Sequence, residues 1–171
     1  MTGIVACSEF SKPNKVVAAF FQNLKQADYE KAHTFLNAPV FDDINTLLDG
    51  YFSTFEIADI KVTNQTGATA IVSADIMAVD FLQTIQGFIM TMPETLEDEG
   101  LSADDITDDA LNALILREIQ SPYALKKTRT VILNLNKTEG KWLIEADKSL
   151  NAALFLLEYN KESDNKDGET E

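Results

Sequence analysis

The period at which apolar residues recur changes along this chain, and that change limits the folds that the chain can adopt. Residues 13–55 carry apolar side chains every three or four positions, which is the spacing of one face of an α-helix. Residues 58–79 and 127–146 instead alternate apolar and polar side chains, as half-buried strands do. The pattern predicts an α+β fold in which N-terminal helices pack on a curved antiparallel sheet.

Three helices are predicted before the first strand. Pro13 suits the first turn of a helix, because its missing N–H would be unpaired there anyway, and this helix is expected to end near Gln26. The third helix is predicted from Phe41 to about Thr54. Asp28 is a good N-cap for the second helix, whose buried face would consist of Tyr29, Ala32, Phe35 and Leu36.

The strands are predicted to form two separate hairpins. Residues 58–63 and 68–79 make the first, joined by a turn at 64–67. Residues 127–137 and 141–146 make the second, joined by a turn that contains Gly140.

A helical acidic insertion is predicted between the two hairpins. Asp80 would cap a helix over 81–92 that ends before Pro93. Residues 94–109 carry eight acidic side chains and no basic one, and 110–119 again show helical spacing. A short closing helix is predicted after the second hairpin, from Leu150, Ala153, Leu154 and Leu157.

The length and net charge of the chain limit the classes of function that it can have. A chain of 171 residues most simply makes one domain, here expected at 13–159 and followed by a disordered acidic tail at 160–171 that has no apolar residue. The chain has 28 acidic and 14 basic residues, and a net charge of −14 repels nucleic-acid phosphates. We therefore expect no nucleic-acid partner.

The single cysteine indicates where the protein is located. Cys7 closes the run Ile4-Val5-Ala6-Cys7, which matches the lipobox of bacterial lipoproteins, so residues 1–12 are expected to be a lipidation site and a tether. This interpretation requires a basic and apolar signal sequence upstream of Met1. The alternative is a free cysteine near a frayed end of a cytoplasmic protein.

Short motifs support a family resemblance. The segments PNKVVAAFF (13–21), ADYEKA (27–32) and EGKWLI (139–144), in this order of elements, resemble the nuclear-transport-factor-like, cystatin-like superfamily. They are similar to segments in bacterial lipoproteins whose domain of this fold has no assigned function. The resemblance implies a cone-shaped domain with a cavity between helices and sheet. Its members range from isomerases and dehydratases to binding or dimerising modules, so fold alone does not choose the function.

No catalytic set is predicted, although three residues are weak candidates. Asp75 lies in the middle of a predicted strand and could be a carboxylate in the cavity, where burial would raise its pKa. The superfamily's isomerases use a carboxylate base with a hydroxyl donor, and the resemblance implies Tyr51 for the second role. The alternative places Asp75 in water on the convex side of the sheet. His33 is the only histidine, and a solitary helical histidine is more often structural than catalytic.

An apolar ligand pocket is the other candidate site. Its expected lining, which could equally be ordinary core, is Phe20, Tyr51, Phe55, Phe88 and Trp142. No cofactor is expected, because the seven glycines form no phosphate-binding spacing. No metal site is expected either, because neither acidic stretch completes a calcium-binding loop.

These features together favour an extracytoplasmic lipoprotein-type domain that binds a small molecule or protein of unknown identity, touches the membrane only through its lipid, and is not an enzyme. Two alternatives remain open. One is an isomerase or dehydratase that uses Asp75. The other is a homodimer in which the exposed sheet face packs against a second copy.

Overall fold

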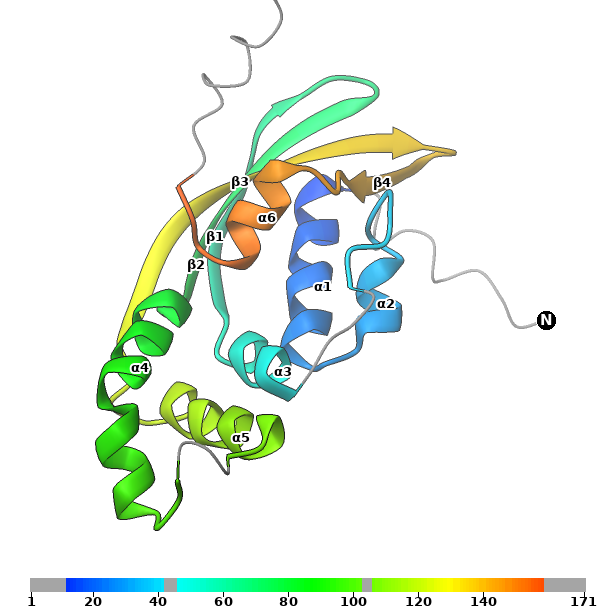
Figure 1. Cartoon of the computed structure of the whole chain (residues 1–171). Helices are drawn as coiled ribbons and strands as arrows, with labels where there is room; N and C mark the ends of the chain where they lie inside the picture. Colours follow the sequence, from blue (N-terminus) through cyan, green and yellow to red (C-terminus); the bar gives the residue numbers. More distant parts are fainter. Residues whose placement is uncertain (1–11, 42–45, 103–105, 159–171) are drawn as a thin grey trace, which may run out of the picture.

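A computed structural model describes residues 12–41, 46–102 and 106–158, and within them helices precede, interrupt and follow the strands (Figure 1). Cys7 and the predicted tail at 160–171 lie outside the described residues. The order of elements is α1 (Pro13–Lys25), α2 (Tyr29–His33), α3 (Thr46–Ser53), β1 (Glu56–Gln65), β2 (Thr69–Val79), α4 (Phe81–Asp98), α5 (Asp108–Ile119), β3 (Lys126–Thr138), β4 (Lys141–Ile144) and α6 (Lys148–Leu154).

The four strands form one antiparallel sheet in the order β1-β2-β3-β4, which confirms the predicted α+β class and its two hairpins. The register of β2 with β3 runs without a break from Thr69 opposite Asn136 to Val79 opposite Lys126. The short strand β4 pairs only with the last four residues of β3, from Leu135 to Thr138. The first two thirds of β3 therefore have a strand on one side only.

One large apolar cluster, which we call the main core, lies between the sheet and helices α1, α2, α3 and α6. Alternate residues of β2 supply the sheet side of this cluster, because successive side chains of a strand point to opposite faces. These residues are Ala70, Val72, Ala74, Ile76 and Ala78.

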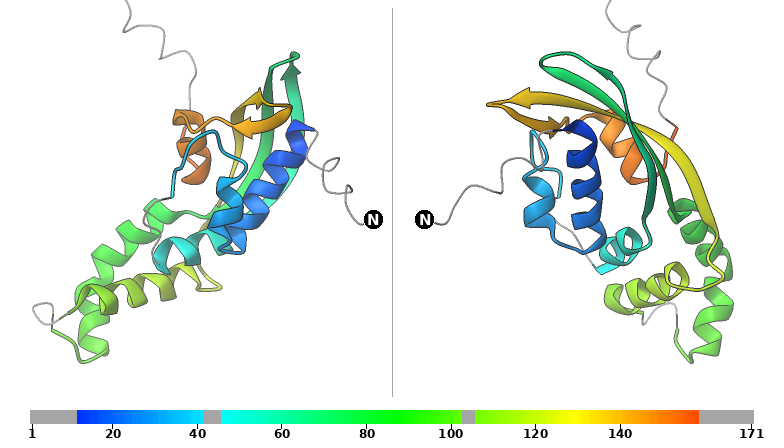
Figure 2. Two further views of the ribbon diagram at one scale, coloured as in Figure 1. Left: turned by 90° about the vertical axis from the view of Figure 1, so that its right-hand side faces the viewer. Right: turned by 180° about the vertical axis from the view of Figure 1, so that it is seen from behind.

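A smaller apolar cluster, which we call the peripheral cluster, joins α4 to α5. Figures 1 and 2 show both helices projecting beyond the end of the sheet, away from the β3–β4 hairpin. The buried members of the cluster are Phe88, Leu96, Leu114, Ile115 and Ile119.

Three predicted helix boundaries were wrong. Helix α2 ends at His33, because Leu36 instead forms a parallel bridge with Ile144 of β4. Phe41 precedes α3 rather than starting it. Helix α4 continues through Pro93 to Asp98, and its C-terminal turn is held by packing of Leu96 in the peripheral cluster.

Candidate functional site

Aromatic side chains fill the space between α1, α3 and the sheet. Phe20, Tyr51 and Phe55 are completely buried. The Tyr51 and Phe55 rings meet edge to face with their centroids 5.2 Å apart, and the Phe20 and Phe21 rings do so at 5.1 Å. Such contacts are those of a packed core rather than of a cavity wall.

The residues predicted to line a ligand pocket fall into two separate places. Phe20, Tyr51, Phe55 and Trp142 belong to the main core, whereas Phe88 belongs to the peripheral cluster. Of the five, Phe55 also borders a shallow surface hollow between α1 and the start of β1.

Tyr51 holds the end of α6 from within the main core. Its hydroxyl donates a hydrogen bond of 3.0 Å to the carbonyl oxygen of Leu154. Burial of the ring and the nearby charge of Asp80 raise the pKa of Tyr51 above its ordinary value. The hydroxyl therefore stays protonated at neutral pH and is engaged in a structural contact.

Asp75 lies on the face of the sheet opposite to Tyr51. Its neighbours Ala74 and Ile76 are buried in the main core, so the Asp75 side chain points to the other face. There the Thr130 hydroxyl donates a hydrogen bond of 2.6 Å to its carboxylate. The structure thus does not bring the two weak catalytic candidates Asp75 and Tyr51 together.

His33 fixes the loop that follows α2. Its Nε2 accepts a hydrogen bond of 3.2 Å from the backbone N–H of Phe41. The two rings are stacked, with centroids 5.4 Å apart and planes only 10° from parallel. Both contacts are local to the loop.

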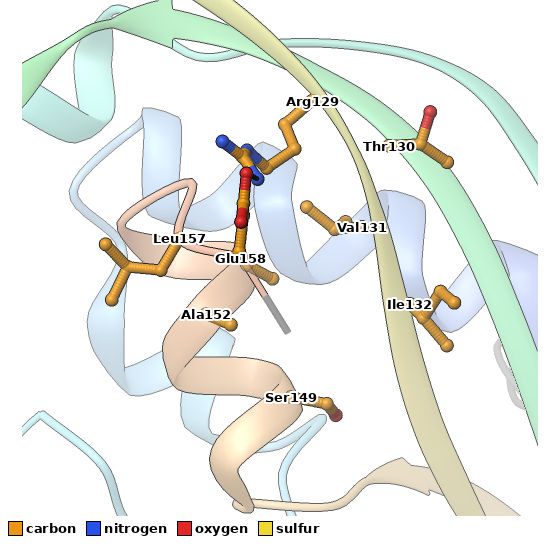
Figure 3. A pocket seen from close by; sticks show the side chains of 9 residues that line it. Arg129, Thr130, Val131, Ile132, Ser149, Ala152, Leu157 and Glu158 are labelled. Atoms are coloured by element: carbon orange, nitrogen blue, oxygen red, sulfur yellow. Dashed lines mark ion pairs between the residues drawn. The ribbon is translucent and has the colours of Figure 1, made fainter. Parts of the chain in front are cut away.

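A groove of about 290 Å³ runs between β3 and α6 (Figure 3). Four successive residues of β3, from Arg129 to Ile132, line one wall. The opposite wall comes from α6 and the two residues that end the described chain, and it consists of Ser149, Ala152, Ala153, Leu157 and Glu158.

An ion pair stands at one end of this groove. Arg129 Nη1 lies 3.3 Å from Glu158 Oε1, and Figure 3 shows the two side chains meeting there. The sequence reasoning missed both residues as site candidates. The available signal was that the long polar side chain of Arg129 shares a strand face with the apolar side chains of Val131 and Leu133.

A polar network at the other end of the groove fixes α6. Asp147 caps the helix by accepting hydrogen bonds from the backbone N–H groups of Ser149 and Leu150. Asn134 of β3 donates a further bond of 2.8 Å to this carboxylate. Burial alone would raise the pKa of Asp147, but the bonds from Ser149, Asn134 and the helix backbone outweigh it and lower that pKa. The groove wall formed by α6 is therefore anchored to β3.

The described residues form no helix that has the length and apolar character needed to cross a membrane. They also contain no cluster of three or more histidine, cysteine or acidic side chains that could hold a metal ion.

Comparison with known proteins adds a structural likeness. No family model matches this chain, and no curated protein matches its sequence. The fold is similar to that of a "putative lipoprotein" (ycdA) from Bacillus subtilis, known from a crystal structure, with a TM-score of 0.44 and 15% sequence identity. The likeness covers 86% of this chain and 47% of that one, so this chain spans about half the length of its neighbour. The resemblance to the cystatin-like superfamily stays a prediction.

Proposed function

We propose that this chain is a non-enzymatic binding domain, held outside the cell membrane by a lipid on Cys7, and that it binds its partner in the groove between β3 and α6. The observation that carries this proposal is the contrast between a filled interior and an open groove. Aromatic rings fill the space between helices and sheet, where the resemblance to the cystatin-like superfamily predicts a cavity. The groove beside β3 instead offers an accessible hollow with an ion pair at its mouth.

The separation of the candidate catalytic groups also supports a binding role. Asp75 and Tyr51 lie on opposite faces of the sheet, and each has a hydrogen-bond partner of its own. A proton-transfer mechanism needs its acid and base within hydrogen-bond reach of one substrate. These two groups do not meet that condition.

Metabolic labelling tests the anchor. The protein is expressed from its own gene, with whatever sequence precedes Met1, in cells fed a radioactive or clickable fatty acid. We expect label on the wild type and on Ser8→Ala, and none on Cys7→Ser. Equal labelling of Cys7→Ser, or an unlabelled wild type, rejects the anchor.

Self-association is a second candidate, favoured by the exposed face of α4. Residues 81–93 of this helix carry no charge in a chain whose net charge is −14. Leu82, Ile89 and Met90 are exposed there, the last to 84%. Sedimentation at micromolar concentration tests this candidate: a dimer that Met90→Lys dissociates supports it, and a strict monomer rejects it.

A further inference from the structure

We propose that the free edge of β3 binds an extended peptide as an added strand of the sheet, and that Arg129 binds a carboxylate of that peptide in place of Glu158. This inference rests on the proposed function, since it names the kind of partner that the groove takes. Extended peptides bind other domains in this way: main-chain hydrogen bonds supply affinity and flanking side chains supply specificity.

The backbone of β3 has unpaired hydrogen-bonding groups along the groove. Lys137 N donates to Ala68 O, so odd-numbered residues of β3 face β2, given the unbroken register of the two strands. Glu145 N donates to Asn134 O, so even-numbered residues face the side of β4. Because β4 is so short, Thr128, Thr130 and Ile132 face that side without a strand beside them. Among the described residues, no hydrogen bond is found to their backbone N–H or C=O groups.

The lining of the groove shows that it follows this edge. Side chains of a strand alternate between faces, so a hollow on one face would be lined by every second residue. Here four successive residues, from Arg129 to Ile132, line it. In Figure 3 the Thr130 side chain points away from α6, toward the face where it bonds Asp75, which leaves its backbone facing the groove.

The wall of the groove that faces β3 carries small side chains. Ala152 and Ala153 are the two residues in the middle of α6 that line the groove, and both side chains are small. An added strand lies about 4.8 Å from its neighbour, and every second side chain would point toward this alanine surface. The geometry favours a peptide with small or β-branched residues at those alternate positions.

The positive charge of Arg129 determines the other feature expected of the partner, which is a carboxylate group. Lys126 and Lys127 of the same strand pair with Glu56 and Asp80, away from the groove lining. The Arg129 side chain is only 26% exposed, whereas that of its partner Glu158 is 76% exposed. The exposed carboxylate of Glu158 therefore pairs with a guanidinium that the fold holds in place, and a peptide carboxylate can replace Glu158 at little cost.

The other exposed edge of the sheet is protected, which sets the β3 edge apart. Strand β1 has two register shifts, and Asp59 there adopts a positive φ of 50°. Such irregularities commonly prevent strands from pairing with other chains. The segment of β3 at the groove is regular, and its edge-facing residues are Thr128, Thr130 and Ile132, none of which is charged.

The test first selects peptides that bind the protein, and then removes one backbone N–H donor of β3, that of Ile132. A phage-displayed library of random decapeptides is selected on the full chain, and the recovered peptides are measured by fluorescence anisotropy. Ile132→Pro removes the edge-facing N–H without touching the ladder to β2, and proline is tolerated at a free edge. Ile132→Thr is the matched control, since it changes the side chain and keeps the N–H.

We expect selected peptides that contain β-branched residues and at least one Asp or Glu. Their affinity should fall about tenfold or more on Ile132→Pro, from the lost hydrogen bond and the bulk of the ring, and stay nearly unchanged on Ile132→Thr. Arg129→Gln should weaken binding roughly tenfold. Glu158→Gln should strengthen it a few-fold, because it removes the competing carboxylate.

Several outcomes overturn the inference. Peptides that bind Ile132→Pro as well as wild type leave a peptide-binding domain but reject the edge. An empty selection rejects a peptide as the partner and leaves the lipid anchor to the labelling experiment. Sedimentation that changes with Ile132→Pro in the absence of peptide assigns the edge to a second copy instead. If circular dichroism shows that Ile132→Pro does not fold, peptides N-methylated at alternate residues are tested on the wild type instead. Methylation at one set of alternate residues must abolish binding, and methylation at the other set must not.

Discussion

Helices α1 and α4 have similar amphipathic sequences but very different surroundings. Seven of the 13 residues of α1 are buried, because the sheet, α2 and α3 all pack on it. Only two of the 18 residues of α4, Phe88 and Leu96, are buried, because α5 is its main partner. An apolar stripe thus determines that a helix forms, while the number of neighbouring elements determines how strongly it is held.

The two clusters should therefore differ in stability. The main core joins residues from the N-terminal helices to α6, so its contacts should break only when the whole domain unfolds cooperatively. The peripheral cluster contacts the rest mainly through α3 and the start of α4, so it can open locally.

The largest expected effect comes from Phe55→Ala in the main core. This ring is completely buried, and removing it should lower the free energy of unfolding by about 3–5 kcal/mol. Urea denaturation followed by circular dichroism measures the change. Leu82→Ala, at an exposed position of α4, is the control and should change stability by no more than about 0.5 kcal/mol.

Phe88→Ala should act on the peripheral cluster alone. We expect a loss of about 2 kcal/mol or less in global stability, since α4 and α5 can open before the sheet does. Hydrogen exchange should show faster exchange in α4 and α5 with little change in β2 and β3. Equal acceleration in the sheet would mean that the two clusters form one cooperative unit.

Gly50→Ala tests the contact between the two regions. A Cβ atom at Gly50 of α3 would lie 2.0 Å from Leu116 Cδ1 of α5, so α5 or the Leu116 side chain must move. The clash outweighs the better helix propensity of alanine, and a net loss of about 1 kcal/mol is expected.

A double mutant identifies the cause of that loss. In a Leu116→Ala background the obstacle is gone, and Gly50→Ala should become neutral or stabilising. Additive effects of the two substitutions would show that the packing of α3 on α5 does not limit stability.

An effect of similar size is expected in the helix that closes the main core, α6. Asp147→Ala removes the N-cap of α6 and should cost about 1 kcal/mol at pH 7, whereas Asp147→Asn keeps a capping oxygen and should cost less. Because folding lowers the pKa of Asp147, its contribution is present above the unfolded pKa and disappears as pH falls through the folded value. The difference between wild type and Asp147→Ala should accordingly shrink in acid below about pH 4. A constant difference from pH 7 to pH 3 would contradict this role.

The sequence predicted the elements better than their ends. Alternation of apolar residues in β2 and helical spacing in α1 depend on local geometry, which the sequence states directly. The end of α2 depends on a bridge from Leu36 to Ile144, more than 100 positions away, and no local pattern reports such a contact. Continuation of α4 through Pro93 likewise depends on packing against α5.

The candidate site was harder to predict for the same reason. A ligand pocket was expected from aromatic residues, but aromatic spacing cannot distinguish a cavity wall from a core. The groove arises because β4 stops after four residues while β3 continues for 13, and α6 then packs beside the uncovered part. Only the tertiary arrangement brings Arg129 and Glu158 to one place.

The hydrogen bond from Tyr51 to Leu154 joins residues 103 positions apart, and it constrains the order of events at the ribosome. The aromatic side chains of α1 and α3 are synthesised early, whereas the residues of β3, β4 and α6 that pack on them are synthesised later. The nascent chain must therefore expose the apolar surface of these helices until α6 has been synthesised. A stop in translation before Leu154 would release an aggregation-prone fragment rather than a smaller folded protein.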